Sequence, residues 1–178
     1  MEDKVIQFNK ITTILSNFSI PSKSYGDASF SIVDPSSNST GSFSYTSSDE
    51  GVATIDGNVI TIVGAGQTTI TATQAETANY ISATIPATFV INKAVPNIGS
   101  LSNIITTYTP VPFTLSTPGS NSPGLFDYEL TNISPVNPTF ASISQNILTL
   151  NTVNGIGSAI VKVTQRETNN YLSVTDSA

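Results

Sequence analysis

Apolar and polar residues alternate along much of this chain, as in Ile70-Thr71-Ala72 and again in Val161-Lys162-Val163. A period of two predicts β-strands that bury one face. Runs rich in Val, Ile, Thr, Phe and Tyr recur about every 8–12 residues between turn-forming residues. Asp56-Gly57-Asn58 separates two such runs and predicts a tight hairpin. No stretch of useful length has the i, i+3, i+4 spacing of a helix, so we expect an all-β sandwich or barrel.

One stretch of the sequence occurs twice. Gly64–Tyr80 and Gly155–Tyr171 match without a gap at a separation of 91 (155 − 64 and 171 − 80). In each copy a Gly-x-Gly turn leads into a strand, and a polar Gln-x-Glu-Thr-x-Asn loop leaves it and ends on a tyrosine. We predict that this tyrosine packs the loop against the sheet edge, where burying the ring is worth about 4–6 kcal/mol as an upper bound. Structure alone therefore accounts for the repeat.

The segments in front of these copies also match each other. Shared residues in 9–32 and 92–115 lie 83 apart (92 − 9), and a later segment matches at 88 (141 − 53). The two changes of separation place insertions around residues 132–138 and 151–154. Insertions confined to loops are what two copies of one sandwich tolerate, so we predict two domains.

The first copy has a characteristic series of residues. In chain order these are Tyr25-Gly26-Asp27-x-x-Phe30, Tyr45-Thr46-Ser47-Ser48-Asp49, Val52-Ala53-Thr54-Ile55, Gly57-Asn58-x-Ile60-Thr61-Ile62, Gly64-Ala65-Gly66, Gln74 and Asn79-Tyr80. The series resembles the bacterial immunoglobulin-like repeats of the group-2 type. Residues 94–178 match more loosely, because Thr109-Pro110 replaces the Gly-Asp pair and Tyr128-Glu129-Leu130 replaces the Tyr-Thr-Ser-Ser run. The resemblance implies two tandem Ig-like β-sandwich domains, at residues 11–93 and 94–178.

The resemblance also implies a function. Such repeats serve as spacers or adhesive modules in surface proteins of bacteria and in structural proteins of phages and large DNA viruses. They have no catalytic residues to carry over, and fold alone does not decide function. Met1 opens the chain without an export signal, which favours a virion component (capsid-associated or fibre) assembled inside the infected cell. The alternatives are a bacterial cell-surface adhesin, located outside the cell, and a glycan-binding module.

The two ends of the chain depart from the repeat. Residues 5–10 resemble residues 88–93, which close the first copy, and Ala178 aligns with Ala87 (178 − 91). We expect the second domain to lack its last strand. Residues 1–10 would be an extra opening strand or the end of a preceding repeat in a longer array. The sharper hypothesis is that residues 5–10 insert into the incomplete domain of a neighbouring structural subunit by strand addition.

Composition excludes several classes of protein. The net charge of −6 with six basic residues lacks the positive surface that nucleic-acid binding needs. No apolar run approaches the roughly 18 residues of a membrane span. Cysteine and histidine are absent, which removes thiolate and imidazole metal ligands and the usual base of a serine nucleophile. We therefore predict no catalytic residue, no cofactor and no metal site, and a protein that is not an enzyme.

Three sets of residues could still support chemistry. Glu76 and Glu167 could act as a carboxylate pair, but they are copies of one loop residue in different domains, which favours loop hydrogen bonding. Asp49, Glu50 and Asp56 could gather oxygen ligands for Ca²⁺ or could be turn formers. The tyrosines could stack on host surface glycans, although their repeat-matched positions favour packing; they are Tyr25, Tyr45, Tyr80, Tyr108, Tyr128 and Tyr171.

Three Asn-x-Ser/Thr sequences occur in the chain, at Asn17, Asn38 and Asn132. They matter only if the chain passes through a eukaryotic secretory route.

Overall fold

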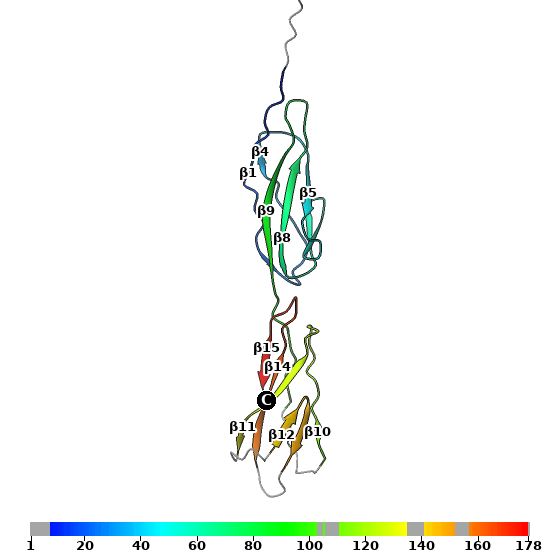
Figure 1. Cartoon of the computed structure of the whole chain (residues 1–178), viewed down its shortest axis with the longest axis vertical. Coiled ribbons are helices and arrows are strands. Elements are labelled where there is room, and N and C mark those ends of the chain that lie inside the picture. The colour runs from blue at the N-terminus through cyan, green and yellow to red at the C-terminus, as the bar shows by residue number, and fades with distance from the viewer. Residues whose placement is uncertain (1–7, 103–104, 106–110, 135–140, 152–156, 178) are drawn as a thin grey trace, which may run out of the picture. The chain divides into compact units, whose positions relative to one another are not determined.

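The computed structural model describes residues 8–102, 105, 111–134, 141–151 and 157–177. Within these ranges the chain forms strands and no helix (Figure 1). The prediction of an all-β chain is confirmed. Accordingly, the described part of the chain contains no helix that could cross a membrane.

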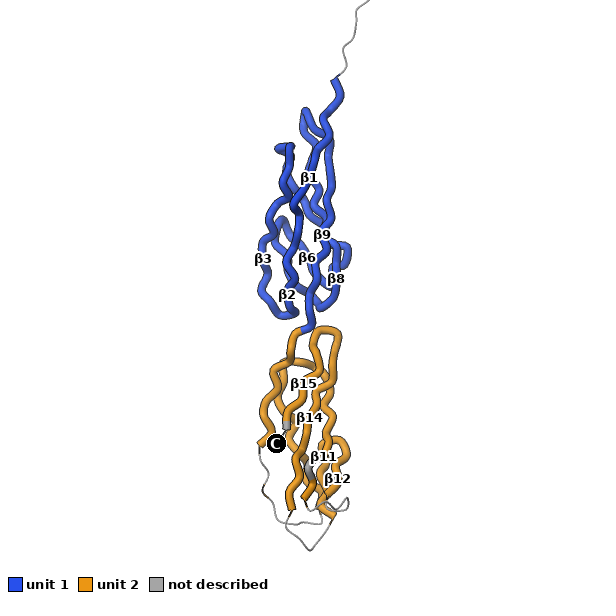
Figure 2. Tube along the Cα trace, turned by 90° about the vertical axis from the view of Figure 1, so that its left-hand side faces the viewer, with its two compact units in different colours: residues 1–93 blue, residues 94–178 orange. Residues whose placement is uncertain are grey.

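The chain divides into two compact units, which we call unit 1 (Met1–Lys93) and unit 2 (Ala94–Ala178), shown in Figure 2. One sheet of unit 1 has the strand order β2-β9-β8-β5. Its strands are β2 (Lys23–Ser24), β9 (Ala83–Asn92), β8 (Gly66–Gln74) and β5 (Phe43–Ser47). The other sheet has the order β3-β7-β6, from β3 (Phe30–Ser31), β7 (Val59–Ile62) and β6 (Ala53–Asp56). A short pair joins β1 (Leu15–Ser16) to β4 (Ser36–Ser37).

The predicted hairpin joins β6 to β7. Asp56 pairs with Val59, so Gly57 and Asn58 form a two-residue turn. Gly57 has φ 55, a left-handed conformation that glycine adopts without strain. The hairpin prediction is confirmed.

The core of unit 1 lies between its two sheets. Alternate residues of β8 point inward, and Ile70 and Ala72 are fully buried as the alternation predicted. Phe89 of β9 is the largest fully buried side chain, and its ring meets the edge of Phe30 with centroids 5.7 Å apart. The buried cluster consists of Ile20, Ile32, Val52, Ala53, Ile60, Ile70, Ala87, Phe89 and Ile91.

Unit 2 also has two sheets, each with three strands among the described residues. One sheet has the order β11-β14-β15, from β11 (Phe126–Ser134), β14 (Ser158–Gln165) and β15 (Val174–Ser177). The other has the order β10-β13-β12, from β10 (Phe113–Thr114), β13 (Ile147–Leu150) and β12 (Ala141–Ser144). Leu115, Val161 and Val163 form its buried cluster.

A buried glutamine holds the same loop in each unit. Gln74 is 1% exposed, and its Nε2 donates to the backbone oxygens of Ser39 (3.1 Å) and Gly41 (2.8 Å). Its Oε1 accepts from Ser37 Oγ. Gln165 is the counterpart in unit 2 (165 − 91 = 74).

The counterpart makes the same bonds. Gln165 Nε2 donates to the backbone oxygens of Ser122 and Gly124, both at 2.9 Å, and its Oε1 accepts from Ser120 Oγ at 2.7 Å. We name the two arrangements the glutamine clamps. Assigning these glutamines to a polar loop was wrong. Each is the last residue of a strand, on the inward face that the period of two prescribes.

The tyrosine-ended loops have matching surroundings. Tyr80 forms an isolated bridge with Ile11, and Tyr171 forms one with Ala94. Within each loop the tyrosine N–H donates to a threonine Oγ1, Thr77 or Thr168, at 3.1 Å. Both tyrosines are half-buried, so burial of their rings contributes less than the predicted upper bound. Backbone hydrogen bonds hold much of each loop.

The predicted insertions and the first strand coincide largely with undescribed residues. The first insertion starts inside β11, where the register shifts between Thr131 and Ser134, so its beginning is strand rather than loop. The remainder, 135–140, and most of the second insertion, 152–156, lie outside the described residues. Of the extra strand predicted at 5–10, residues 8–10 are described and form no strand.

Candidate functional site

The two candidate glutamates lie in different units. Glu76 is exposed and its carboxylate lies 3.0 Å from Lys10 Nζ. A surface ion pair of this kind contributes about 0–1 kcal/mol. Glu167 is also exposed, in unit 2. The structure thus shows Glu76 in a surface salt bridge with Lys10.

Of the candidate calcium ligands, Asp49 and Glu50 lie in a turn, whereas Asp56 is the last residue of β6. Asp49 Oδ1 accepts from Gly51 N at 2.9 Å, and the Asp49 backbone oxygen accepts from Val52 N and Ala53 N. This is the bonding that makes aspartate a turn former. Across the ranges that the structure describes, no three acidic residues gather where they could hold a metal ion.

The tyrosines divide into two groups. Tyr25, Tyr45 and Tyr128 pack against the cores, whereas Tyr80 and Tyr171 end the loops already described. Tyr108 lies outside the described residues. The packing prediction is therefore correct for the three core tyrosines.

The three glycosylation sequences lie in different settings. Asn17 is exposed with φ 57, and exposed Asn38 accepts through Oδ1 from Ile14 N at 2.9 Å. Asn132 lies in β11.

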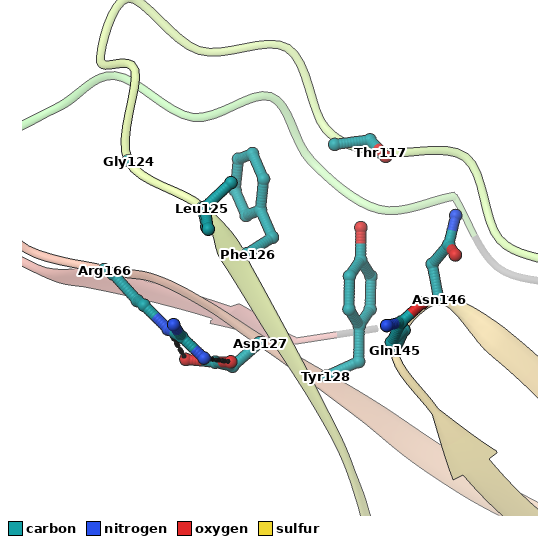
Figure 3. Close-up of a pocket in the computed structure, with 9 residues that line it drawn as sticks. All are labelled: Thr117, Gly124, Leu125, Phe126, Asp127, Tyr128, Gln145, Asn146 and Arg166. Atoms are coloured by element: carbon teal, nitrogen blue, oxygen red, sulfur yellow. Dashed lines mark hydrogen bonds and ion pairs between the residues drawn. The ribbon is translucent and has the colours of Figure 1, made fainter.

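Sequence reasoning missed a hollow in unit 2, with a volume of about 530 Å³. This volume is within the range of about 300–1,000 Å³ usual for small-molecule sites. The lining residues, drawn in Figure 3, are Thr117, Gly124, Leu125, Phe126, Asp127, Tyr128, Gln145, Asn146 and Arg166. They come from the start of β11, the β12–β13 turn, the end of β14 and the segment after β10.

The Gln165 clamp positions one wall of this hollow. Arg166, the next residue, donates its backbone N–H to the Leu125 oxygen at 2.8 Å. The Arg166 oxygen lies so close to Gly124 that a Cβ there would stand 2.2 Å from it. Only glycine permits this approach, so the backbone that presents Leu125 and Arg166 is held tightly.

An ion pair lies along the same wall. Arg166 Nε donates to Asp127 Oδ2 at 2.7 Å and Arg166 Nη2 donates to Asp127 Oδ1 at 2.6 Å (Figure 3). The hydrogen bond from Arg166 lowers the pKa of Asp127, and the bond to Asp127 raises the pKa of Arg166. Both side chains are exposed, so solvent screens the pair, and its value lies in fixing the orientation of two polar groups without net charge.

A buried hydroxyl lies beside this wall. Tyr128 Oη is inaccessible to solvent and has no hydrogen-bond partner among the described residues. Figure 3 shows its ring directed towards the segment that carries Thr117. A buried polar atom without a partner is uncommon in folded proteins and calls for an explanation.

The counterpart hydroxyl in unit 1 does have a partner. Tyr45 matches Tyr128 (128 − 83), and its Oη donates to Asp34 Oδ1 at 2.5 Å. Burial and this bond raise the pKa of Tyr45. The residue that matches Asp34 is Thr117 (117 − 83), so unit 2 keeps the tyrosine but has exchanged its acceptor.

Comparison with known families addresses the first unit. Residues 30–85 match the family model of the bacterial Ig-like domain (group 2). This segment is therefore similar to a group-2 bacterial Ig-like domain. The match runs from β3 into the start of β9, so the resemblance deduced from the sequence is confirmed for these residues, all of which lie in unit 1.

Solved structures give distant likenesses. Human protocadherin-24 EC1-2 has 10% identity and a TM-score of 0.37, and covers 95% of this chain and 97% of its own. Drosophila N-cadherin EC1-3 has 14% identity and a TM-score of 0.35, covering 95% and 66%. A SusE-like surface located polysaccharide binding protein from Bacteroides thetaiotaomicron has 16% identity and a TM-score of 0.33, covering 93% and 33%. No curated protein matches the chain.

Proposed function

We propose that this chain is a non-enzymatic Ig-like repeat protein with a structural or adhesive task. One observation supports this most directly: the bonds that recur in both units hold the backbone. The glutamine clamps and the tyrosine-ended loops are kept in each unit, and both fix loops to sheets. Repetition of an architectural framework is expected of a spacer or an adhesive array.

The location we propose is the virion, as a capsid-associated or fibre component. The bacterial cell surface is the alternative, because the resemblance to group-2 Ig-like repeats implies a role in either setting. Gold-labelled antibodies against this chain, imaged on purified particles and on intact cells, distinguish the two. We expect label on the outside of particles. Label only on cells would move the protein to the bacterial surface, and label on neither would contradict a structural role at a surface.

The proposed partners are other structural subunits. β15 pairs with Lys162–Gln165 of β14. On that same side of β14, the described residues provide no strand that pairs with Ser158–Val161. In unit 1, β9 continues past the equivalent point and buries Phe89 and Ile91. A strand with this alternation would complete unit 2, whether the same chain or another subunit supplies it.

Residues 5–10 have the sequence for that task. Deleting residues 1–10 from the 178-residue chain should reduce its self-association, measured by sedimentation, if these residues act as the added strand. Unchanged association together with unchanged unfolding would contradict strand addition.

A second candidate function is glycan binding, because unit 2 carries the hollow described above. Host surface glycans are then the proposed partners. A glycan array probed with the full chain tests this function directly.

A further inference from the structure

We infer that the hollow of unit 2 is a binding site for a neutral saccharide, formed in part by residues that differ from their counterparts in unit 1. This deepens the glycan-binding candidate and rests on it. Each of the nine lining residues has a repeat counterpart in unit 1 with which it can be compared.

Four lining residues are the same in the two units. They are Gly124, Phe126, Tyr128 and Asn146, which match Gly41, Phe43, Tyr45 and Asn58. The two glycines are framework residues, because Gly41, like Gly124, allows a close backbone approach: a Cβ at Gly41 would stand 2.0 Å from the Ala75 oxygen. The two asparagines also hold the backbone. Asn146 Nδ2 donates to the Leu115 oxygen at 3.0 Å, as Asn58 does to the Ile32 oxygen at 3.5 Å.

The other five lining residues have all been exchanged. In unit 2 they are Thr117, Leu125, Asp127, Gln145 and Arg166, where unit 1 has Asp34, Ser42, Ser44, Gly57 and Ala75. Four of these exchanges add a larger side chain. Unit 2 has therefore kept the framework of the hollow and changed its lining, as expected where one copy of a repeat acquires a ligand.

One exchange works against the local backbone. Gln145 occupies the β12–β13 turn with φ 52, at the position where Gly57 has φ 55 in the first hairpin. A left-handed conformation is strained for a residue with a side chain and unstrained for glycine. Strain of this kind gathers at functional sites, and here it places an amide on the lining.

The chemistry of the lining selects the ligand. Phe126 and Leu125 supply apolar surface, Asp127 supplies acceptor oxygens, and Arg166 has five N–H donors of which two bind Asp127. The Asp127–Arg166 pair is neutral overall. A ligand with many hydroxyl groups, one apolar face and no charge uses all of these groups, and a neutral sugar ring fits that description.

The exchanged acceptor supports the same assignment. Thr117 replaces the carboxylate that receives the tyrosine hydroxyl in unit 1, and it leaves Tyr128 Oη without a partner among the described residues. A ligand hydroxyl beside Thr117 would supply the missing acceptor once the side chains that cover Tyr128 Oη move aside. An anionic ligand is disfavoured, because the arginine already binds a carboxylate.

The test uses the full chain on an array of neutral, sialylated and sulfated glycans, followed by titration of the best neutral oligosaccharide by isothermal calorimetry. Three variants each replace a lining residue of unit 2 by its counterpart in unit 1: Gln145→Gly, Arg166→Ala and Thr117→Asp. We expect each to weaken binding at least about tenfold, equivalent to one lost hydrogen bond. Gln145→Gly should not lower the unfolding midpoint, because glycine relieves the turn.

Matched controls lie in unit 1. Lys10→Ala removes the Lys10–Glu76 surface ion pair, and Asp34→Thr removes the acceptor of Tyr45. Neither should change the affinity. Binding to no neutral glycan, preference for acidic glycans, or full affinity in Gln145→Gly and Arg166→Ala would each overturn the inference. None of these outcomes would change the result of the antibody-labelling experiment. The labelling therefore tests the structural role independently of glycan binding.

Discussion

Units 1 and 2 share a hydrogen-bonded framework, but their buried apolar clusters, counted over the described residues, differ in size. Gln74 and Gln165 make the same three side-chain bonds, so the loops they hold are fixed in the same way. The buried cluster of unit 1, however, includes Phe89 and Ile91 from the second half of β9. The described residues of unit 2 contain no counterpart of this half-strand. The comparison teaches that local polar bonds specify the loops of this fold, while the last strand supplies much of the core.

The largest effect should come from the core residue that distinguishes the units. Phe89→Ala removes the largest fully buried side chain of unit 1 and should lower its stability by about 3–5 kcal/mol. Chemical denaturation followed by amide NMR resolves the two units. Val90→Ala, on the exposed face of the same strand, is the control. A loss below about 1 kcal/mol would show that Phe89 does not hold the core.

The glutamine clamps should give the next largest effect, and an equal one in both units. Gln74→Met or Gln165→Met keeps the length of the side chain but leaves two backbone carbonyls without their donor. We expect about 2–4 kcal/mol of destabilisation in the affected unit, since each orphaned buried group costs about 1–3 kcal/mol. Exposed Gln67→Met is the control. A large loss in one unit only would break the equivalence of the frameworks.

Exchanging the tyrosine acceptors should sharpen the comparison with a smaller effect of opposite sign in each unit. Thr117→Asp gives Tyr128 an acceptor and should stabilise unit 2, whereas Asp34→Thr should destabilise unit 1, each by about 1 kcal/mol. Thermal unfolding monitored by unit-resolved NMR measures both changes. If the Tyr128→Phe variant cancels the gain from Thr117→Asp, the gain comes from the new bond; a gain that survives has another origin.

Alkaline pH should produce the smallest difference. The pKa of Tyr45 is raised in the folded chain by burial and by the bond to Asp34, whereas unfolded tyrosine titrates near 10. The unfolded state therefore releases its proton first. The contribution of the neutral Tyr45 hydroxyl to the stability of unit 1 is complete below pH about 10 and falls as pH rises above it. Tyr45→Phe should flatten this decline in unit 1, measured by denaturation at pH of about 9 and about 11. An unchanged slope would contradict the assignment.

Much of the fold could be predicted because its signals are local. The alternation in Ile70-Thr71-Ala72 and the turn at Gly57 need only neighbouring residues, and both predictions are confirmed. The clamps were missed although a signal existed. Extending the period of two from Ala72 places Gln74 on the inward face, but its polarity suggested a loop.

The hollow could not be predicted in the same way, because its contacts join distant residues. Asp127 and Arg166 are 39 residues apart, and the missing acceptor of Tyr128 is visible only when Tyr45 and Asp34 are seen bonded. The repeat alignment shows which residues differ, but not that five of the differences line one space. At Asp49 the sequence left two interpretations, a calcium ligand or a turn former. The hydrogen bond that Asp49 accepts from Gly51 N supports the turn.

The close crossing at Gly124 has a practical consequence for protein engineering. Because the main chain there is fastened by Gln165 and by the Arg166–Leu125 bond, the side chains of Leu125, Asp127 and Arg166 project from a rigid base. Libraries randomised at these three positions should retain the parent backbone while changing what it recognises. The second repeat is thereby a ready scaffold for selecting new specificities, and its neighbour can serve as an inert handle for display.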